Sequence, residues 1–171
     1  IYPTPAAPTI TPAGPITQCG GSVSLTASGG HASYVWSPGG STANPLVVTS
    51  TGTYSAVGIS TYGCTSASST GVAVTINAIP VVDPIYGPSY IDVGSTGTFY
   101  DATPSGTWYS GNEGIATVDS SGNATGVSPG DVYIYYAVTN AGCTTTVNIL
   151  VSILWTLNAY PSDIGFDSNG I

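Results

Sequence analysis

Three cysteines, one histidine and eight acidic residues are the side chains in this sequence with the most scope for chemistry. The cysteines are Cys19, Cys64 and Cys143, and no two of them form the C-x-x-C pair typical of zinc sites and thiol-exchange enzymes. His31 lies in a glycine-rich loop. Because the chain is also rich in Ser, Thr and Gly, the cysteines favour an oxidising, extracellular environment over a metal site.

Catalysis would require groups that this sequence does not bring together. His31 would need a serine and an aspartate held beside a loop of glycines. A carboxylate pair for glycoside hydrolysis would have to include Glu113, the single glutamate. We therefore expect no catalytic residues and no enzymatic activity.

The charge of the chain excludes several classes of function. It has no Lys or Arg and a formal net charge of -8. Without basic side chains it cannot neutralise nucleic-acid phosphates or dock on an anionic lipid surface. No apolar run is long enough to cross a bilayer. We expect no nucleic-acid partner, no membrane insertion and an extracellular or cell-surface location.

Short segments rich in Val, Ile, Thr and Tyr recur along the chain, separated by Gly, Pro, Asn and Ser. Examples are SVSLTAS, GTYSAVGIS, GVAVTIN and DVYIYYAVT. No segment has the 3.6-residue periodicity and the caps of a helix. Strands at this spacing predict an all-β chain of antiparallel β-sandwiches.

The sequence also repeats itself. TYSAVGISTYGCT aligns with VYIYYAVTNAGCT, which places Cys64 on Cys143, and upstream Trp36 aligns with Trp108. Landmarks in the same order indicate two related units joined near the proline-rich segment 77–84. Both tryptophans are predicted core residues, although aromatic stacking on sugars is the alternative.

Each unit resembles a known kind of bacterial domain. The first, with QCGGSVSLTASGG, YVWSPGG and GCTSASS, resembles the Ig-like repeats, related to PKD-type domains, of giant bacterial adhesins. The second, with WYSGNEGIATVDSSGNATGVSPGDVYIYY, resembles group 2 bacterial Ig-like domains of the intimin and invasin type. The resemblance implies tandem Ig-like sandwiches without catalytic residues. The expected divisions are a Pro-rich extended arm (1–14), Ig-like domain 1 (15–79), Ig-like domain 2 (80–153) and a C-terminal tail (154–171).

An Ig-like fold implies a disulfide between Cys19 and Cys64, with Trp36 between them in sequence. Two buried free thiols are the alternative. The repeat aligns Cys19 with Asp92, so the second unit is expected to have lost one half of the equivalent bridge. Cys143 is accordingly predicted to be a free thiol, with an intermolecular disulfide as the alternative. On this interpretation, a bond from Cys143 to Cys19 or Cys64 would overturn the repeat alignment and, with it, the division into two domains.

The sequence also predicts two candidate ligand sites. Tyr109 and Tyr135 belong to a tyrosine-rich surface that would suit a glycan or another adaptable contact, although ordinary β-propensity explains it as well. In the tail, Asp163, Asp167 and Asn169 offer oxygens to Ca²⁺, but their spacing lacks the full calcium-loop pattern and fits a turn. No other cofactor is expected.

The leading functional hypothesis is a non-enzymatic structural or adhesive module of a bacterial surface fibre, filament or giant adhesin. The expected partners are other copies or neighbouring Ig-like repeats, reached through the terminal arms by β-strand addition. The alternatives are a carbohydrate-binding module that uses the tyrosine surface, and a phage fibre or decoration protein.

Overall fold

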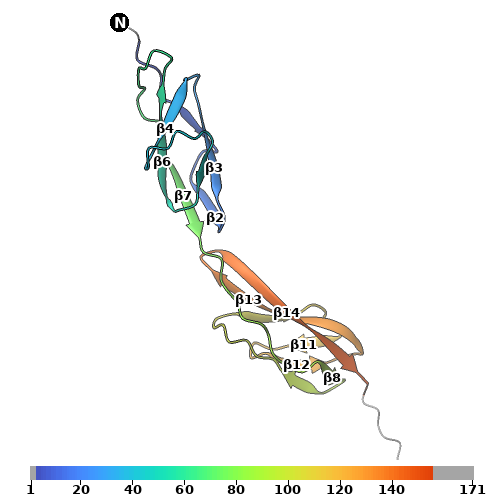
Figure 1. Ribbon diagram of the computed structural model, residues 1–171. Helices are drawn as coiled ribbons and strands as arrows, with labels where there is room; N and C mark the ends of the chain where they lie inside the picture. The colour runs from blue at the N-terminus through green and yellow to red at the C-terminus, as the bar shows by residue number, and fades with distance from the viewer. Residues whose placement is uncertain (1–2, 156–171) are drawn as a thin grey trace, which may run out of the picture. The chain divides into compact units, whose positions relative to one another are not determined.

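A computed structural model describes residues 3–155. These residues form strands β1 to β14 and no helix, as the alternating sequence patterns predict. These residues divide into two compact units: residues 3–80 together with Thr139–Thr144, and residues 81–138 together with 145–155. Figure 1 labels several strands of each unit.

The first unit is a sandwich of two sheets. One sheet has the order β1-β3-β5 and the other has the order β2-β7-β6-β4. The strands are β1 (Thr9–Thr11), β2 (Ile16–Cys19), β3 (Val23–Ser28), β4 (Ser33–Ser37), β5 (Leu46–Val48), β6 (Gly52–Ile59) and β7 (Val72–Asn77).

Alternation along each strand puts one row of side chains between the two sheets. In β3, Val23, Leu25 and Ala27 are buried and the residues between them are exposed. Trp36 of β4 is only 1% exposed, and its indole N–H donates to Ala43 O at 2.8 Å. Trp36 is therefore confirmed as a core residue.

The chain passes from one sheet to the other within the predicted arm. Thr9–Thr11 pairs antiparallel with β3, whereas Ile16–Cys19 pairs parallel with β7. Pro12 and Pro15 end the first pairing because they lack the N–H that a strand needs. Between them, a Cβ on Gly14 would lie 3.1 Å from Ala73 N, so glycine allows the close approach.

The second unit repeats this arrangement. Its sheets have the orders β10-β13-β14-β8 and β11-β12-β9. The strands are β8 (Tyr90–Asp92), β9 (Thr96–Thr98), β10 (Thr107–Ser110), β11 (Ala116–Val118), β12 (Asn123–Gly126), β13 (Gly130–Asn140) and β14 (Cys143–Leu154). As β2 runs parallel to the last strand of the first unit, β7, so β8 runs parallel to the last strand of the second unit, β14. Figure 1 shows the long β13–β14 hairpin in orange.

The core of the second unit combines both sheets. Phe99, Ile134, Val151 and Ile153 are among its most buried side chains. Trp108 is only partly buried: it packs against this core and lies 4.6 Å from the Tyr136 ring. The predicted fold class, all-β with tandem Ig-like sandwiches, is confirmed.

Removing the Trp36 side chain should unfold the first sandwich. We expect Trp36→Ala to lower the free energy of unfolding by about 3–5 kcal/mol, because it leaves a cavity and an unpaired Ala43 carbonyl. Chemical denaturation followed by tryptophan fluorescence and circular dichroism measures this. Val47→Ala, at a position that is 61% exposed in the same unit, is the control and should change stability by less than about 0.5 kcal/mol. A near-native transition for Trp36→Ala would contradict the core assignment.

Candidate functional site

Among the described residues, Cys19 and Cys143 form a disulfide bond. Cys19 is the last residue of β2, and Cys143 is the first residue of β14. Their Cα atoms are 5.5 Å apart. Cys143 is 1% exposed, and close by Asn77 Nδ2 donates to Ala141 O at 2.7 Å. The bond closes a covalent ring across 124 positions of sequence.

The predicted bond between Cys19 and Cys64 is wrong, and the sheet topology gives the reason. Cys19 lies beside Asn77, at the end of β7, because β2 and β7 are parallel. The segment with Cys64 follows β6, which is antiparallel to β7 and continues beyond its start. The path from Asn77 back along β7 and on along β6 is about ten residues, or roughly 30 Å. A disulfide needs Cα atoms within about 7 Å.

The prediction of a free thiol at Cys143 is also wrong, since the free cysteine is Cys64, which is partly exposed. The backbone nevertheless supports the alignment of the repeats at these positions. Cys19 and Asp92 both end a strand that runs parallel to the last strand of its unit. What failed was the assumption that each bridge joins cysteines of the same repeat.

A tyrosine cluster lies on the outer face of the β10–β13 pair. Tyr109 and Tyr135 are register partners, and their rings stack with centroids 4.9 Å apart and an interplanar angle of 6°. Tyr133 lies 6.2 Å from Tyr135 in a tilted arrangement. Tyr109 is 42% and Tyr133 46% exposed. The structure thus brings together the two tyrosines that the sequence singled out.

The neighbouring strand β14 extends this face. Thr139 and Thr144 hydroxyls are 2.8 Å apart, and Ser152 Oγ donates to Asp131 Oδ1 at 2.7 Å. One antiparallel register of β13 with β14 pairs Thr139 with Thr144 and Asp131 with Ser152. The same register places Leu150 opposite Tyr133. Leu150 is also exposed. The outer face therefore carries a mixed aromatic and aliphatic stripe.

The residues considered for catalysis have structural surroundings. The His31 ring meets Tyr34 edge-on at 5.5 Å and lies so close to Gly58 that a Cβ there would overlap the ring. Glu113 is exposed. Ser128, in the G-V-S-P-G segment 126–130, donates to Gly114 O at 2.6 Å, and it lies between two strands rather than at the strand-to-helix turn of a nucleophile. Within residues 3–155, no three His, Cys, Asp or Glu side chains cluster as metal ligands do.

The calcium candidates Asp163, Asp167 and Asn169 lie outside the described residues. Another acidic turn, D-S-S-G at 119–122, is described and connects β11 with β12. Asp119 Oδ2 accepts from the Asn123 side chain, and Oδ1 accepts from the backbone N–H groups of Asn123 and Ser121. These hydrogen bonds, above all the one from the Asn123 side chain, lower the pKa of Asp119.

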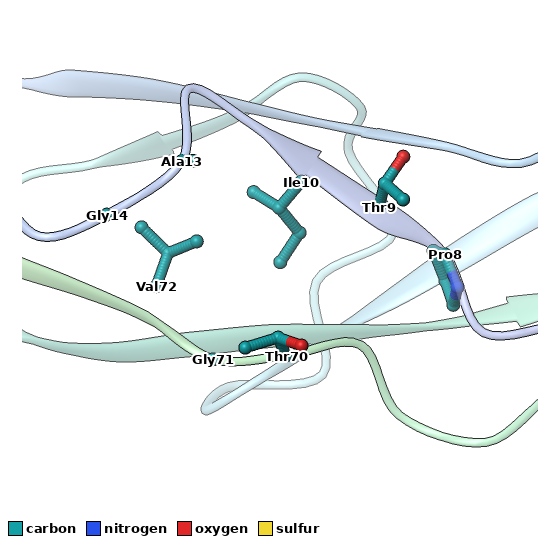
Figure 2. Close-up of a pocket in the computed structure, with 8 residues that line it drawn as sticks. All are labelled: Pro8, Thr9, Ile10, Ala13, Gly14, Thr70, Gly71 and Val72. Atoms are coloured by element: carbon teal, nitrogen blue, oxygen red, sulfur yellow. The ribbon is translucent and has the colours of Figure 1, made fainter.

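A small cavity of about 270 Å³ lies between β1 and the start of β7. Figure 2 shows the side chains of Ile10 and Val72 on its two sides. Its lining has no ionisable side chain and consists of Pro8, Thr9, Ile10, Ala13, Gly14, Thr70, Gly71 and Val72. The cavity offers no group for catalysis.

Residues 92–148 match the family model of the bacterial Ig-like domain (group 2). The second unit therefore resembles a bacterial Ig-like domain. This segment runs from the end of β8 into β14 and includes both tyrosine strands. The resemblance to bacterial Ig-like repeats that the sequence suggested is confirmed.

Solved structures with similar folds include immunoglobulin domains and fibronectin(III)-like modules. An intimin mutant from EHEC O157:H7 is 22% identical, with 43% of this chain and 48% of that chain covered and a TM-score of 0.34. Immunoglobulin domains 1–4 of Sidekick-1 are 18% identical, with coverage of 86% and 49% and a TM-score of 0.37. Fibronectin(III)-like modules of Clostridium thermocellum CbhA are 15% identical, with coverage of 86% and 93% and a TM-score of 0.36.

This chain spans about half the length of the intimin and Sidekick-1 chains. Comparison with curated proteins finds no match. Residues 3–155 contain no helix with the length and apolar character needed to cross a membrane.

The disulfide can be mapped directly. We expect non-reduced, denatured protein alkylated at neutral pH to carry one label, on Cys64, because the other two thiols are bonded. Peptides from a protease that does not need Lys or Arg should include a Cys19–Cys143 pair that separates on reduction. A label on Cys143, or a Cys19–Cys64 pair, would contradict the structure.

Proposed function

We propose that this chain is a non-enzymatic structural section of an extracellular bacterial fibre, stalk or adhesin. The family match of the second unit and the tandem sandwich fold support this role. The absence of Lys and Arg from the sequence fits a surface exposed to proteases that cut at basic residues. A disulfide fits an oxidising location outside the cell.

The Cys19–Cys143 bond is the observation that carries the proposal. Tension applied to the two ends of the chain runs along residues 1–19, crosses the sulfur–sulfur bond, and leaves along residues 143–171. The residues between the cysteines lie outside that path. A module with this connectivity resists lengthening because most of its chain cannot be drawn out while the bond is intact.

The N-terminal arm is less free than the sequence suggested. Thr9–Thr11 already pairs with β3 of its own unit. Strand addition to another copy by these three residues would require that pairing to open. The proposed structural role therefore depends on the disulfide and on neighbouring repeats rather than on exchange of β1.

Single-molecule pulling between the two ends tests the role. We expect the reduced chain to extend about 40 nm further than the oxidised chain, because reduction frees 124 positions at roughly 3.3–3.6 Å each. The variant Cys19→Ser with Cys143→Ser should behave like the reduced chain without reductant. Cys64→Ser is the matched control and should retain the short extension. Equal extension of the oxidised and reduced chains would contradict the proposal.

Carbohydrate binding by the tyrosine face is the second hypothesis, and the ring geometry counts against it. A sugar stacks on an aromatic ring whose face is open to solvent. Tyr109 and Tyr135 instead cover one face of each other. Cross-strand aromatic pairs of this kind stabilise a sheet by about 0.2–1 kcal/mol, so the stack has a structural explanation.

A glycan array with the full chain distinguishes these two roles for the tyrosines. We expect no glycan signal that depends on Tyr109, and we expect Tyr109→Ala to lower the melting temperature by a few degrees because the stack is lost. Tyr62→Ala, an exposed tyrosine of the first unit, controls for general surface effects. A glycan signal that Tyr109→Ala and Tyr135→Ala both abolish would establish the carbohydrate-binding hypothesis instead.

A further inference from the structure

Cys64 occupies the same place in its repeat as Cys143 does in the next. Each residue follows a glycine with positive φ, 78° at Gly63 and 80° at Gly142. Each comes directly after the turn that follows the strand paired with the tryptophan strand, β6 beside β4 and β13 beside β10. The turns differ in length: Ile59 and Thr65 pair across five intervening residues, whereas only Ala141 and Gly142 separate the end of β13 from Cys143, the first residue of β14.

Contacts between the flanking residues close each turn. Thr65 bridges to Ile59 across the first turn, and the Thr144 hydroxyl lies 2.8 Å from that of Thr139 across the second. The backbone of Cys64 is fixed, since its N–H donates to Ser60 Oγ at 3.1 Å and its C=O accepts from Ser60 N at 2.9 Å. Its thiol is partly exposed, whereas Cys143 is bonded and buried.

The partner position is also defined twice. Cys19 ends β2, and the next N–H, of Gly20, donates to Asn77 O at 2.8 Å. Asp92 ends β8, and the next N–H, of Val93, donates to Leu154 O at 2.8 Å. The two residues thus hold equivalent positions, and only the first repeat has a cysteine there.

We propose that Cys64 forms a disulfide with a cysteine of an Ig-like repeat on its N-terminal side. In that repeat the cysteine ends the strand equivalent to β2, as Cys19 does here. The observed bond has this direction: the turn cysteine of one repeat binds the strand-end cysteine of the repeat before it. A second copy of this chain cannot supply the partner in head-to-tail order, because its last repeat has Asp92 at that position. The inference rests on the proposed role as one section of a tandem array.

The bond forms by thiol–disulfide exchange with a small-molecule disulfide, such as oxidised glutathione. Its two sulfurs are reduced to two thiols, which take up the two protons and two electrons lost by Cys64 and the partner cysteine. One sulfur–sulfur bond breaks and one forms. No metal or enzyme is required by this balance.

A fusion of two full-length copies in head-to-tail order tests the proposal, with Asp92→Cys and Cys64→Ser in the first copy. The last repeat of the first copy then has the strand-end thiol, and Cys64 of the second copy is the remaining turn thiol. After equilibration with reduced and oxidised glutathione, alkylation and peptic mapping report the state of Cys64. We expect at least about ten-fold less label on Cys64 than in the fusion that retains Asp92, because the tether gives a high effective concentration.

Two controls separate a built site from chance contact. A fusion with Thr117→Cys in place of Asp92→Cys has an exposed thiol on β11 at the same tether length and should leave Cys64 labelled. The unfused Asp92→Cys chain mixed with the natural chain tests a partner on a separate molecule. Bonding in the fusion alone would assign the partner to the same polypeptide, and bonding in both arms would allow either source.

Full labelling of Cys64 in the Asp92→Cys fusion, or equal protection by Thr117→Cys, would overturn the inference. Recovery of the Cys19–Cys143 peptide pair from both copies shows that the variants have folded. Peptide mapping of the non-reduced protein from its natural source is an independent test, in which Cys64 should be bonded and not alkylated. Since pulling experiments report only on Cys19 and Cys143, the proposed function and this inference can fail separately.

Discussion

The parallel pairing of β2 with β7, and of β8 with β14, is the constraint on which the rest of each unit depends. It exists because the chain crosses between sheets at a proline-containing segment, Pro12–Pro15 in the first unit. After the crossing, β2 runs in the same direction as β7 and ends where β7 ends. This places Cys19 beside Asn77, and away from the turn that holds Cys64. The identity of the disulfide follows from that placement.

The units are stabilised by burial and hydrogen bonds and not by ion pairs with Lys or Arg, which the chain lacks. Asn44 makes a two-point contact with the backbone of Ala27, accepting at 2.9 Å and donating at 2.8 Å. The Tyr136 hydroxyl donates to Thr103 O at 2.6 Å. Ser69 Oγ accepts a hydrogen bond from the backbone N–H of Ala56 at 3.0 Å. Without Ser69, this N–H of the buried residue on β6 would have no partner. Salt should therefore affect stability less than in a protein with many ion pairs.

The cysteines and tyrosines that the sequence singled out as candidate functional residues have structural roles in the disulfide and in the tyrosine stack. Cys19 and Cys143 act as a covalent connection between segments 124 positions apart in the sequence. The rings of Tyr109 and Tyr135 stack on each other across two strands, which leaves less aromatic surface for a ligand. The features that suggested binding or catalysis in the sequence are thus better explained as parts of a structural repeat.

The sequence by itself determined the local structure and the equivalence of the repeats. Alternating patterns such as V-S-L-T-A-S fix strands because a period of two leaves one apolar face. The turn at Asp119–Gly122 follows from the ability of Gly122 to adopt a φ of 84°. Aligned motifs identified Trp36 as a core residue and Cys64 as the equivalent of Cys143. Only the tertiary structure decided which cysteines bond, because that depends on the end of the sheet at which each strand stops. It also decided that Tyr109 faces Tyr135, because strand register is a property of the pair and not of either segment alone.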